Sequence, residues 1–236
     1  MEFSLYVAMA PMGTLPRELG YARFFCPFEK EIPQKEALPD GILPILTDST
    51  PYAGQSAETL AQEWLPLLQG CPGVVLDFQQ KGQPGVWDFV QEFRRLIPCP
   101  VAAPPEYAGT EGPVFLPPIP PDTPPEEALA PWQGREIWLD LAGCGRKLTL
   151  TPMGCRGEDW DAGEAQGYPE EALCCHYRVT KPQANTFQFL LWRGKTDLIR
   201  LMEKGNKLGV RRYVGLYPEL SSCGFLPAHS APGSDR

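Results

Sequence analysis

The segment Gly73-Val74-Val75-Leu76-Asp77-Phe78-Gln79 decides the fold class of this chain. It is a continuous apolar run with β-branched residues, which is typical of a parallel strand buried on both faces. Its two polar side chains, Asp77 and Gln79, are two residues apart and therefore lie on one face of the strand. The segment predicts a central strand that carries a polar pair at its carboxyl end.

Short apolar runs alternate with helical patterns on both sides of this segment. Strands are expected at residues 3–8, 42–47, 100–103, 113–116, 136–141, 147–150, 174–180, 186–192 and 213–217. Helices are expected at 57–68, 87–97, 123–132 and 197–208, with Ser56, Thr123 and Thr196 as N-terminal caps. This alternation predicts an α/β fold, a compact (β/α)8 TIM-barrel-like domain.

The length and the proline content shape this expectation. The chain has 236 residues, which favours one domain. Of its 28 prolines, 12 lie between Pro98 and Pro131, so helices there are expected to be reduced to turns. We expect a single barrel-like domain over residues 1–227 and a flexible polar tail over 228–236.

Charge and hydropathy exclude several classes of protein. The formal net charge is −8 and no basic patch is visible, which argues against a nucleic-acid binder. No apolar run approaches the roughly 18 residues of a membrane span. The first residues lack the charged and apolar regions of a signal peptide. Reduced cysteines and a cytoplasmic location are therefore expected, with a secreted form whose signal has been removed as the alternative.

Residues 72–79 resemble the D-G-x-D-x-D-x-E motif of the chitinase-type glycoside hydrolases, family eighteen. Gly73 stands at the glycine of that motif and Asp77 at its last aspartate. Gln79 stands where the catalytic glutamate would stand. Pro72 and Val75 occupy the other two aspartate positions. The resemblance therefore implies a degenerate member of the family.

Three further stretches are similar to the spore-cortex-lytic branch of that family, namely residues 42–54, 135–141 and 176–217. The closing tryptophan of the family would fall on Tyr217. The family's Met-x-Tyr-Asp pattern, expected near residues 116–119, is absent. The order of these pieces over residues 3–220 implies a short barrel of this family.

The resemblance also implies which chemistry is lost. The family uses the N-acetyl group of its substrate as the nucleophile, a glutamic acid as proton donor and an aspartate two residues earlier to orient that group. Gln79 cannot act as a general acid, and losing such help costs about 10²–10⁴ in rate. Its amide can still donate and accept hydrogen bonds. A carbohydrate partner, such as an N-acetylated oligosaccharide, would then be bound without hydrolysis.

Other side chains near predicted strand ends are candidate ligand contacts. Asp48 and Glu106 are carboxylates that could bind sugar hydroxyls, although both also fit ordinary loop positions. Aromatic rings could stack on sugars, although strand aromatics more often belong to the core. The full set of expected contacts is Asp77, Gln79, Tyr6, Asp48, Glu106, Tyr107 and Tyr217.

Two alternative functions remain open at this point. The first is an active glycosidase that uses other carboxylates, Glu106 with Asp77 or Asp140. The second is a scaffold or interaction protein without a small ligand. Asp77 and Gln79 would then be a polar pair inside the barrel, bonded to each other or to water.

No cofactor and no metal are predicted. Cys174-Cys175-His176 is not spaced like a metal site, because neighbouring strand residues point to opposite faces and no C-x-x-C pair completes it. Core cysteines are expected there. The chain has no Walker loop and no G-x-G-x-x-G motif, so nucleotide binding has no support.

Overall fold

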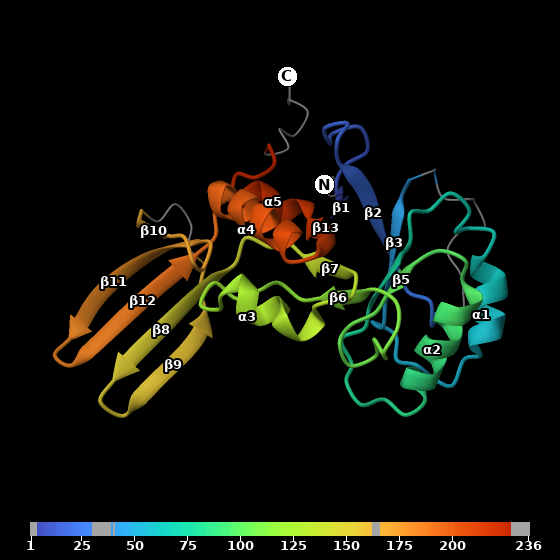
Figure 1. Cartoon of the computed structure of the whole chain (residues 1–236), viewed down its shortest axis with the longest axis horizontal. Coiled ribbons are helices and arrows are strands. Elements are labelled where there is room, and N and C mark those ends of the chain that lie inside the picture. Colours follow the sequence, from blue (N-terminus) through green and yellow to red (C-terminus); the bar gives the residue numbers. More distant parts are fainter. Residues whose placement is uncertain (1–3, 30–38, 40, 162–165, 228–236) are drawn as a thin grey trace, which may run out of the picture. The chain divides into compact units, whose positions relative to one another are not determined.

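The computed structural model describes residues 4–29, 39, 41–161 and 166–227 (Figure 1). The predicted tail at 228–236 lies outside the described residues. The chain forms two compact units. The first contains Met1–Pro117, Gly134–Asp140 and Gly209–Val214, and the second contains Pro118–Gln133, Leu141–Leu208 and Gly215–Arg236. No described helix is both long and apolar enough to cross a membrane.

Parallel strands build the first unit, in the order β5-β4-β3-β2-β1-β13-β7-β6. The ends of this order meet at a parallel bridge between Ala103 and Val114, where Phe115 N donates to Ala103 O at 2.8 Å. The sheet therefore closes into an α/β barrel, which confirms the predicted fold class. Its strands are β1 (Ser4–Ala8), β2 (Gly20–Phe25), β3 (Leu43–Thr47), β4 (Val74–Asp77), β5 (Val101–Ala102), β6 (Val114–Leu116), β7 (Ile137–Asp140) and β13 (Val210–Leu216).

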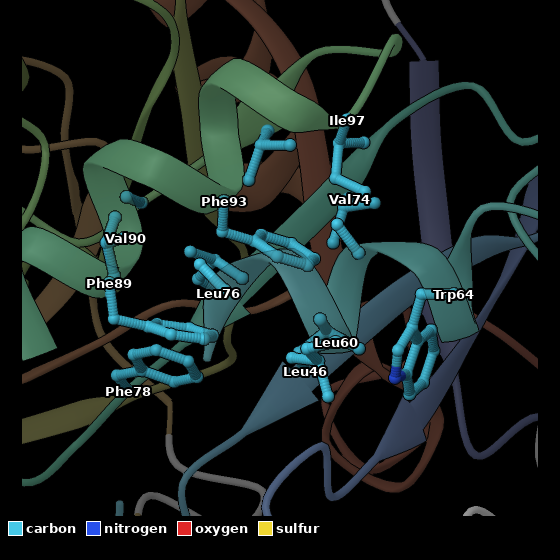
Figure 2. Packing of buried hydrophobic residues seen from close by; sticks show 14 of the residues in the cluster. Leu46, Leu60, Trp64, Val74, Leu76, Phe78, Phe89, Val90, Phe93 and Ile97 are labelled. Atoms are coloured by element: carbon cyan, nitrogen blue, oxygen red, sulfur yellow. The ribbon is translucent and has the colours of Figure 1, made fainter. Parts of the chain in front are cut away.

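Two helices, α1 (Ala57–Trp64) and α2 (Val86–Leu96), pack on the outside of β3 and β4. Figure 2 shows Leu46 of β3 and Leu76 of β4 in the apolar layer that these helices cover. Ser56 caps α1 as predicted, since its Oγ accepts from Thr59 N at 3.4 Å. The helix ends before the predicted residue 68, because Pro66 has no N–H to continue it.

The proline-rich connection between β5 and β6 contains no helix, as its composition predicted. Two arginines bind its backbone instead. Arg94 of α2 donates to the carbonyls of Ala108 and Pro113, the latter at 2.9 Å. Arg135 donates to Gly109 at 2.7 Å and to Gly112 at 2.8 Å. These bonds satisfy carbonyls that a helix would otherwise have paired.

A tryptophan fills the barrel interior. Trp138 of β7 is fully buried, and the Arg212 guanidinium of β13 lies 4.4 Å from its ring centre. Trp138 Nε1 donates to Glu136 at 2.7 Å, and Arg212 donates to Pro72 O at 2.6 Å. A Cβ on Gly73 would lie 2.6 Å from the Trp138 ring. Glycine is therefore required at this position.

The second unit contains a five-stranded antiparallel sheet of order β10-β11-β12-β8-β9. The sequence pattern did not predict β9, β10 and α5 of this unit, because none of them shows a regular apolar period. It did not predict β2 of the first unit for the same reason. The strands are β8 (Gly145–Thr151), β9 (Gly154–Asp159), β10 (Tyr168–Glu170), β11 (Cys175–Gln183) and β12 (Thr186–Trp192). The helices are α3 (Pro125–Leu129), the 3-10 turn η1 (Ala130–Trp132), α4 (Lys195–Lys207) and α5 (Tyr217–Ser222).

Two predicted helix caps are wrong. The helix α4 begins at Lys195, so Thr196 lies inside it and Gly194 is the N-cap. Asp197 completes this start, because its Oδ2 accepts from Gly194 N at 3.0 Å. The helix α3 has Pro124 as its N-cap and no side-chain cap, so Thr123 lies one residue too early.

A buried arginine holds the second unit together. Arg193 donates to the carbonyls of Leu173 and Cys174, both at 3.0 Å, and to Pro120 O at 3.2 Å. Cys174 and Cys175 are buried beside it, which confirms them as core residues. In the described part of the chain, no group of three or more histidine, cysteine or acidic residues could hold a metal ion.

We expect the substitution Trp138→Phe to lower the free energy of unfolding by about 2 kcal/mol, because it removes buried volume and the hydrogen bond to Glu136. Trp87→Phe provides a matched control, since Trp87 lies on α2 and is 51% exposed whereas Trp138 is fully buried. The control should change stability by less than about 0.5 kcal/mol. Urea unfolding of both variants measures this, and equal effects would contradict the role of Trp138.

Candidate functional site at the carboxyl end of the barrel

The predicted pair Asp77 and Gln79 is brought together. Asp77 is the last residue of β4 and lies beside Thr47 of β3. Its neighbour Leu76 belongs to the outer core layer, so the alternation along the strand turns Asp77 toward the barrel interior. Asp77 is half-buried and Gln79 is exposed. The Gln79 side-chain amide donates a short hydrogen bond to Asp77 Oδ1.

Asp48 fixes the backbone of this pair. It follows β3 directly and is buried. Its Oδ1 accepts from Gln79 N at 2.8 Å, and its Oδ2 accepts from Gln80 N at 2.7 Å. In return, Gln80 Nε2 donates to Asp48 O at 2.6 Å. Both carboxylate oxygens are thus bonded to backbone amides, which holds Gln79 in place.

Tyr107, in the connection after β5, supports the same loop. Its hydroxyl donates to Gln80 O at 2.7 Å, and its ring lies 6.3 Å from the Phe78 ring. Gln91 Nε2 donates to Tyr107 O at 2.8 Å. Because the ring is buried, Tyr107 positions the loop after β4 and offers little aromatic surface for stacking.

An ion pair joins the two loops at the rim. Lys81 Nζ lies 2.5 Å from Glu106 Oε1, and both side chains are exposed. Lys81 lowers the pKa of Glu106, which keeps that carboxyl ionised. The pKa of Lys81 is raised in turn.

The pKa of Asp77 is raised, and burial is the main cause. The hydrogen bond from Gln79 opposes this shift, whereas the negative charge of Asp48 adds to it. Asp77 and Glu106 therefore have pKa values displaced in opposite directions.

The remaining predicted residues are dispersed. Tyr6 is half-buried in β1 beside Gly20 of β2. Asp140 ends β7 and lies beside Val214 of β13, at the same end of the barrel strands as Asp77. Tyr217 begins α5 in the second unit, where it is buried and its hydroxyl donates to Pro227 O at 2.8 Å.

Sequence reasoning missed a polar cluster beside Asp77. Cys26, directly after β2, has its sulfur 2.9 Å from Ser49 Oγ. Ser49 Oγ lies 3.3 Å from Thr47 Oγ1. A strand assignment for residues 20–25 would have placed Cys26 at this end of the barrel, but β2 was not predicted.

A hollow at the other end of the strands is a weaker candidate. It opens where β6 and β7 begin, and the guanidinium of Arg135 in its wall already binds backbone carbonyls. Its lining residues are Thr110, Gly112, Pro113, Gly134, Arg135 and Glu136.

No protein-family model and no curated protein matches this chain. Solved structures of similar fold include the spore cortex-lytic enzyme SleL of Bacillus megaterium QM B1551, with 12% identity and a TM-score of 0.40 over 74% of this chain. This chain covers 55% of that enzyme, about half of its length.

This chain covers a larger share of two other similar structures. The putative sporulation-specific glycosylase ydhD from Bacillus subtilis shows 13% identity and a TM-score of 0.48, over 73% of this chain and 78% of that chain. The chitinase from Chromobacterium violaceum ATCC 12472 shows 9% identity and a TM-score of 0.48, over 92% of this chain and 94% of that chain. At these identities the likeness concerns the fold alone.

The substitution Asp48→Asn should lower the free energy of unfolding by about 1–3 kcal/mol, because an amide has one acceptor oxygen and leaves one of the two bonded backbone N–H groups without its charged partner. Asp88→Asn is the control, since Asp88 is exposed on α2 and should cost only a few tenths of a kcal/mol. Denaturant unfolding at pH 7 measures both. Equal stability of the two variants would show that the Asp48 bonds are dispensable.

The raised pKa of Asp77 predicts a pH-dependent effect of Asp77→Asn. The folded chain holds this proton at a higher pH than the unfolded chain, so the contribution of Asp77 to stability falls as pH rises above about 4. The variant should therefore be more stable than the wild type at pH 7. This gain should shrink toward pH 4 in unfolding measurements. A variant less stable than the wild type at pH 7 would contradict the assignment.

Proposed function

We propose that the carboxyl end of this barrel binds a carbohydrate through Asp77 and Gln79 without hydrolysing it. The observation that carries the proposal is the pair itself, a half-buried carboxylate and an exposed amide joined by a hydrogen bond at the end of β4. Among the described residues, Asp77 Oδ2 and Gln79 Oε1 accept no hydrogen bond. Both are suited to accept from sugar hydroxyls, and the second amide hydrogen of Gln79 can donate.

Preorganisation supports the same proposal. Ordering a flexible side chain on binding costs about 0.5–1.5 kcal/mol. Asp48 fixes the backbone of Gln79, and Asp77 fixes its side chain, so much of this cost is met before a ligand arrives. A few convergent polar groups on a rigid element are characteristic of small-ligand sites.

The lack of hydrolysis follows from the position of the amide. A general acid must release a proton near neutral pH, and the Gln79 amide does not. The proposed ligand class, oligosaccharides with N-acetyl groups, comes from the resemblance of residues 72–79 to the chitinase-type motif. An acetamido group offers both a donor and an acceptor to this pair.

Calorimetric titration with N-acetylglucosamine oligomers of increasing length tests the proposal. Affinity should rise with length, and Gln79→Ala should weaken binding about tenfold, the loss of one or two hydrogen bonds. Gln62→Ala is the control, because Gln62 is exposed on α1. No heat with any oligomer, or equal binding by both variants, would refute the proposal and favour a scaffold without a small ligand.

One observation favours a second candidate, an active glycosidase. The pKa of Asp77 is raised while that of Glu106 is lowered, and such opposed pairs mark an acid and its partner in other hydrolases. The ion pair with Lys81 argues for a structural role of Glu106. Release of reducing ends by the wild type, abolished in both Asp77→Asn and Glu106→Gln, would establish this second function.

We also propose a reducing compartment for the protein. The buried cysteines Cys174 and Cys175 are free thiols, and free thiols are usual in the cytosol, where disulfides are rare. Burial raises the pKa of Cys175 to about 12, so this thiol stays protonated and unreactive.

A further inference from the structure

The edge strand β9 of the second unit is open to pairing. Within the part of the chain that the structure describes, β9 pairs only with β8, and Figure 1 shows it beside β8 at one side of the sheet. The opposite edge strand, β10, has three residues and includes Pro169, two features that blunt an edge. β9 has six residues and no proline. It therefore offers a complete row of backbone donors and acceptors.

The bonds to β8 show which groups of β9 point outward. Trp160 N donates to Gly145 O at 3.1 Å, so the peptide groups of Arg156 and Glu158 also face β8, because this orientation alternates along a strand. The N–H and C=O groups of Cys155, Gly157 and Asp159 consequently point away from the sheet.

We propose that two copies of this chain pair antiparallel through β9, about a two-fold axis at Gly157. Ladder bonds can form only where outward-facing residues lie opposite each other. Two registers with two-fold symmetry meet this condition and pair most residues of β9 with the second copy. One is centred on Arg156 and the other on Gly157. The first places the two Arg156 side chains directly opposite each other, and like charges in that position are destabilising.

The register centred on Gly157 places opposite charges together. Arg156 lies opposite Glu158 of the second copy, and the symmetry repeats this contact. Both side chains lie on one face, because they are two residues apart. Gly157 meets Gly157 at the axis, and Cys155 lies opposite Asp159 of the second copy.

The same charges select the partner. Charged side chains on an edge strand normally prevent pairing with other chains. The order Arg156-Gly157-Glu158 is self-complementary about its centre. Arg156 therefore meets the opposite charge of Glu158 in a second copy, and Glu158, which also pairs with Lys147 of its own β8, meets Arg156. An unrelated strand offers no such match. The sheet of the dimer would run continuously through both copies. This interface does not depend on the carbohydrate proposal.

Sedimentation of the wild type and charge variants tests the dimer. The wild-type dimer should have a dissociation constant below about 0.5 mM. Arg156→Glu should raise this constant about tenfold or more. Combining Arg156→Glu with Glu158→Arg exchanges the charges and should restore the wild-type constant to within about threefold. Arg178→Glu is the matched control, since Arg178 is exposed on the inner strand β11. A wild type that stays monomeric, or equal effects of the two single substitutions, would overturn the proposal.

A cross-link tests the register itself. Residues 155 and 159 of opposite copies would form a hydrogen-bonded pair with Cα atoms about 5.5 Å apart, which suits a disulfide. Oxidation of the Asp159→Cys variant should give a covalent dimer. The same substitution combined with Cys155→Ser should give none. A covalent dimer in both variants, or in neither, would contradict the Gly157-centred register.

Discussion

The barrel closes at its shortest strand, and two arginines hold it there. β5 contains only Val101 and Ala102, and the closure beyond it rests on the bridge from Ala103 to Val114. The prolines that prevent a helix between β5 and β6 leave carbonyls that need donors. Arg94 and Arg135 supply them between Ala108 and Pro113. These bonds fix the connection that leads from one closing strand of the barrel to the other.

The connection that closes the barrel also holds the candidate site in place. Tyr107 lies in the connection that the arginines hold, and its hydroxyl supports the loop after β4. Asp48 holds the same loop from β3. Gln79 is thus fixed from both neighbouring strands and from its own strand through Asp77. An exposed amide held in this way is consistent with a binding site in which the backbone moves little.

The sequence predicted most of the barrel because buried parallel strands are apolar and bounded by turns. It also predicted that Asp77 and Gln79 share a face, because strand side chains alternate. It did not predict β9, whose residues Gly-Cys-Arg-Gly-Glu-Asp have no apolar period. Nor did it predict the roles of Asp48, Arg94 and Arg193, because bonds from side chains to distant backbone groups leave no local pattern. The caps at Thr123 and Thr196 failed for a related reason, since Gly194 and Asp197 together provided a better start for α4.

The proposed function rests on contact between the ligand and Gln79 at the end of β4. Amide NMR spectra of the ¹⁵N-labelled chain, recorded during titration with an N-acetylglucosamine oligomer, test this claim directly. We expect the largest shifts at the Gln79 side-chain amide and at the backbone amides of Gln79 and Gln80, which donate to Asp48. Shifts confined to the antiparallel sheet, or to the hollow beside Arg135, would contradict it.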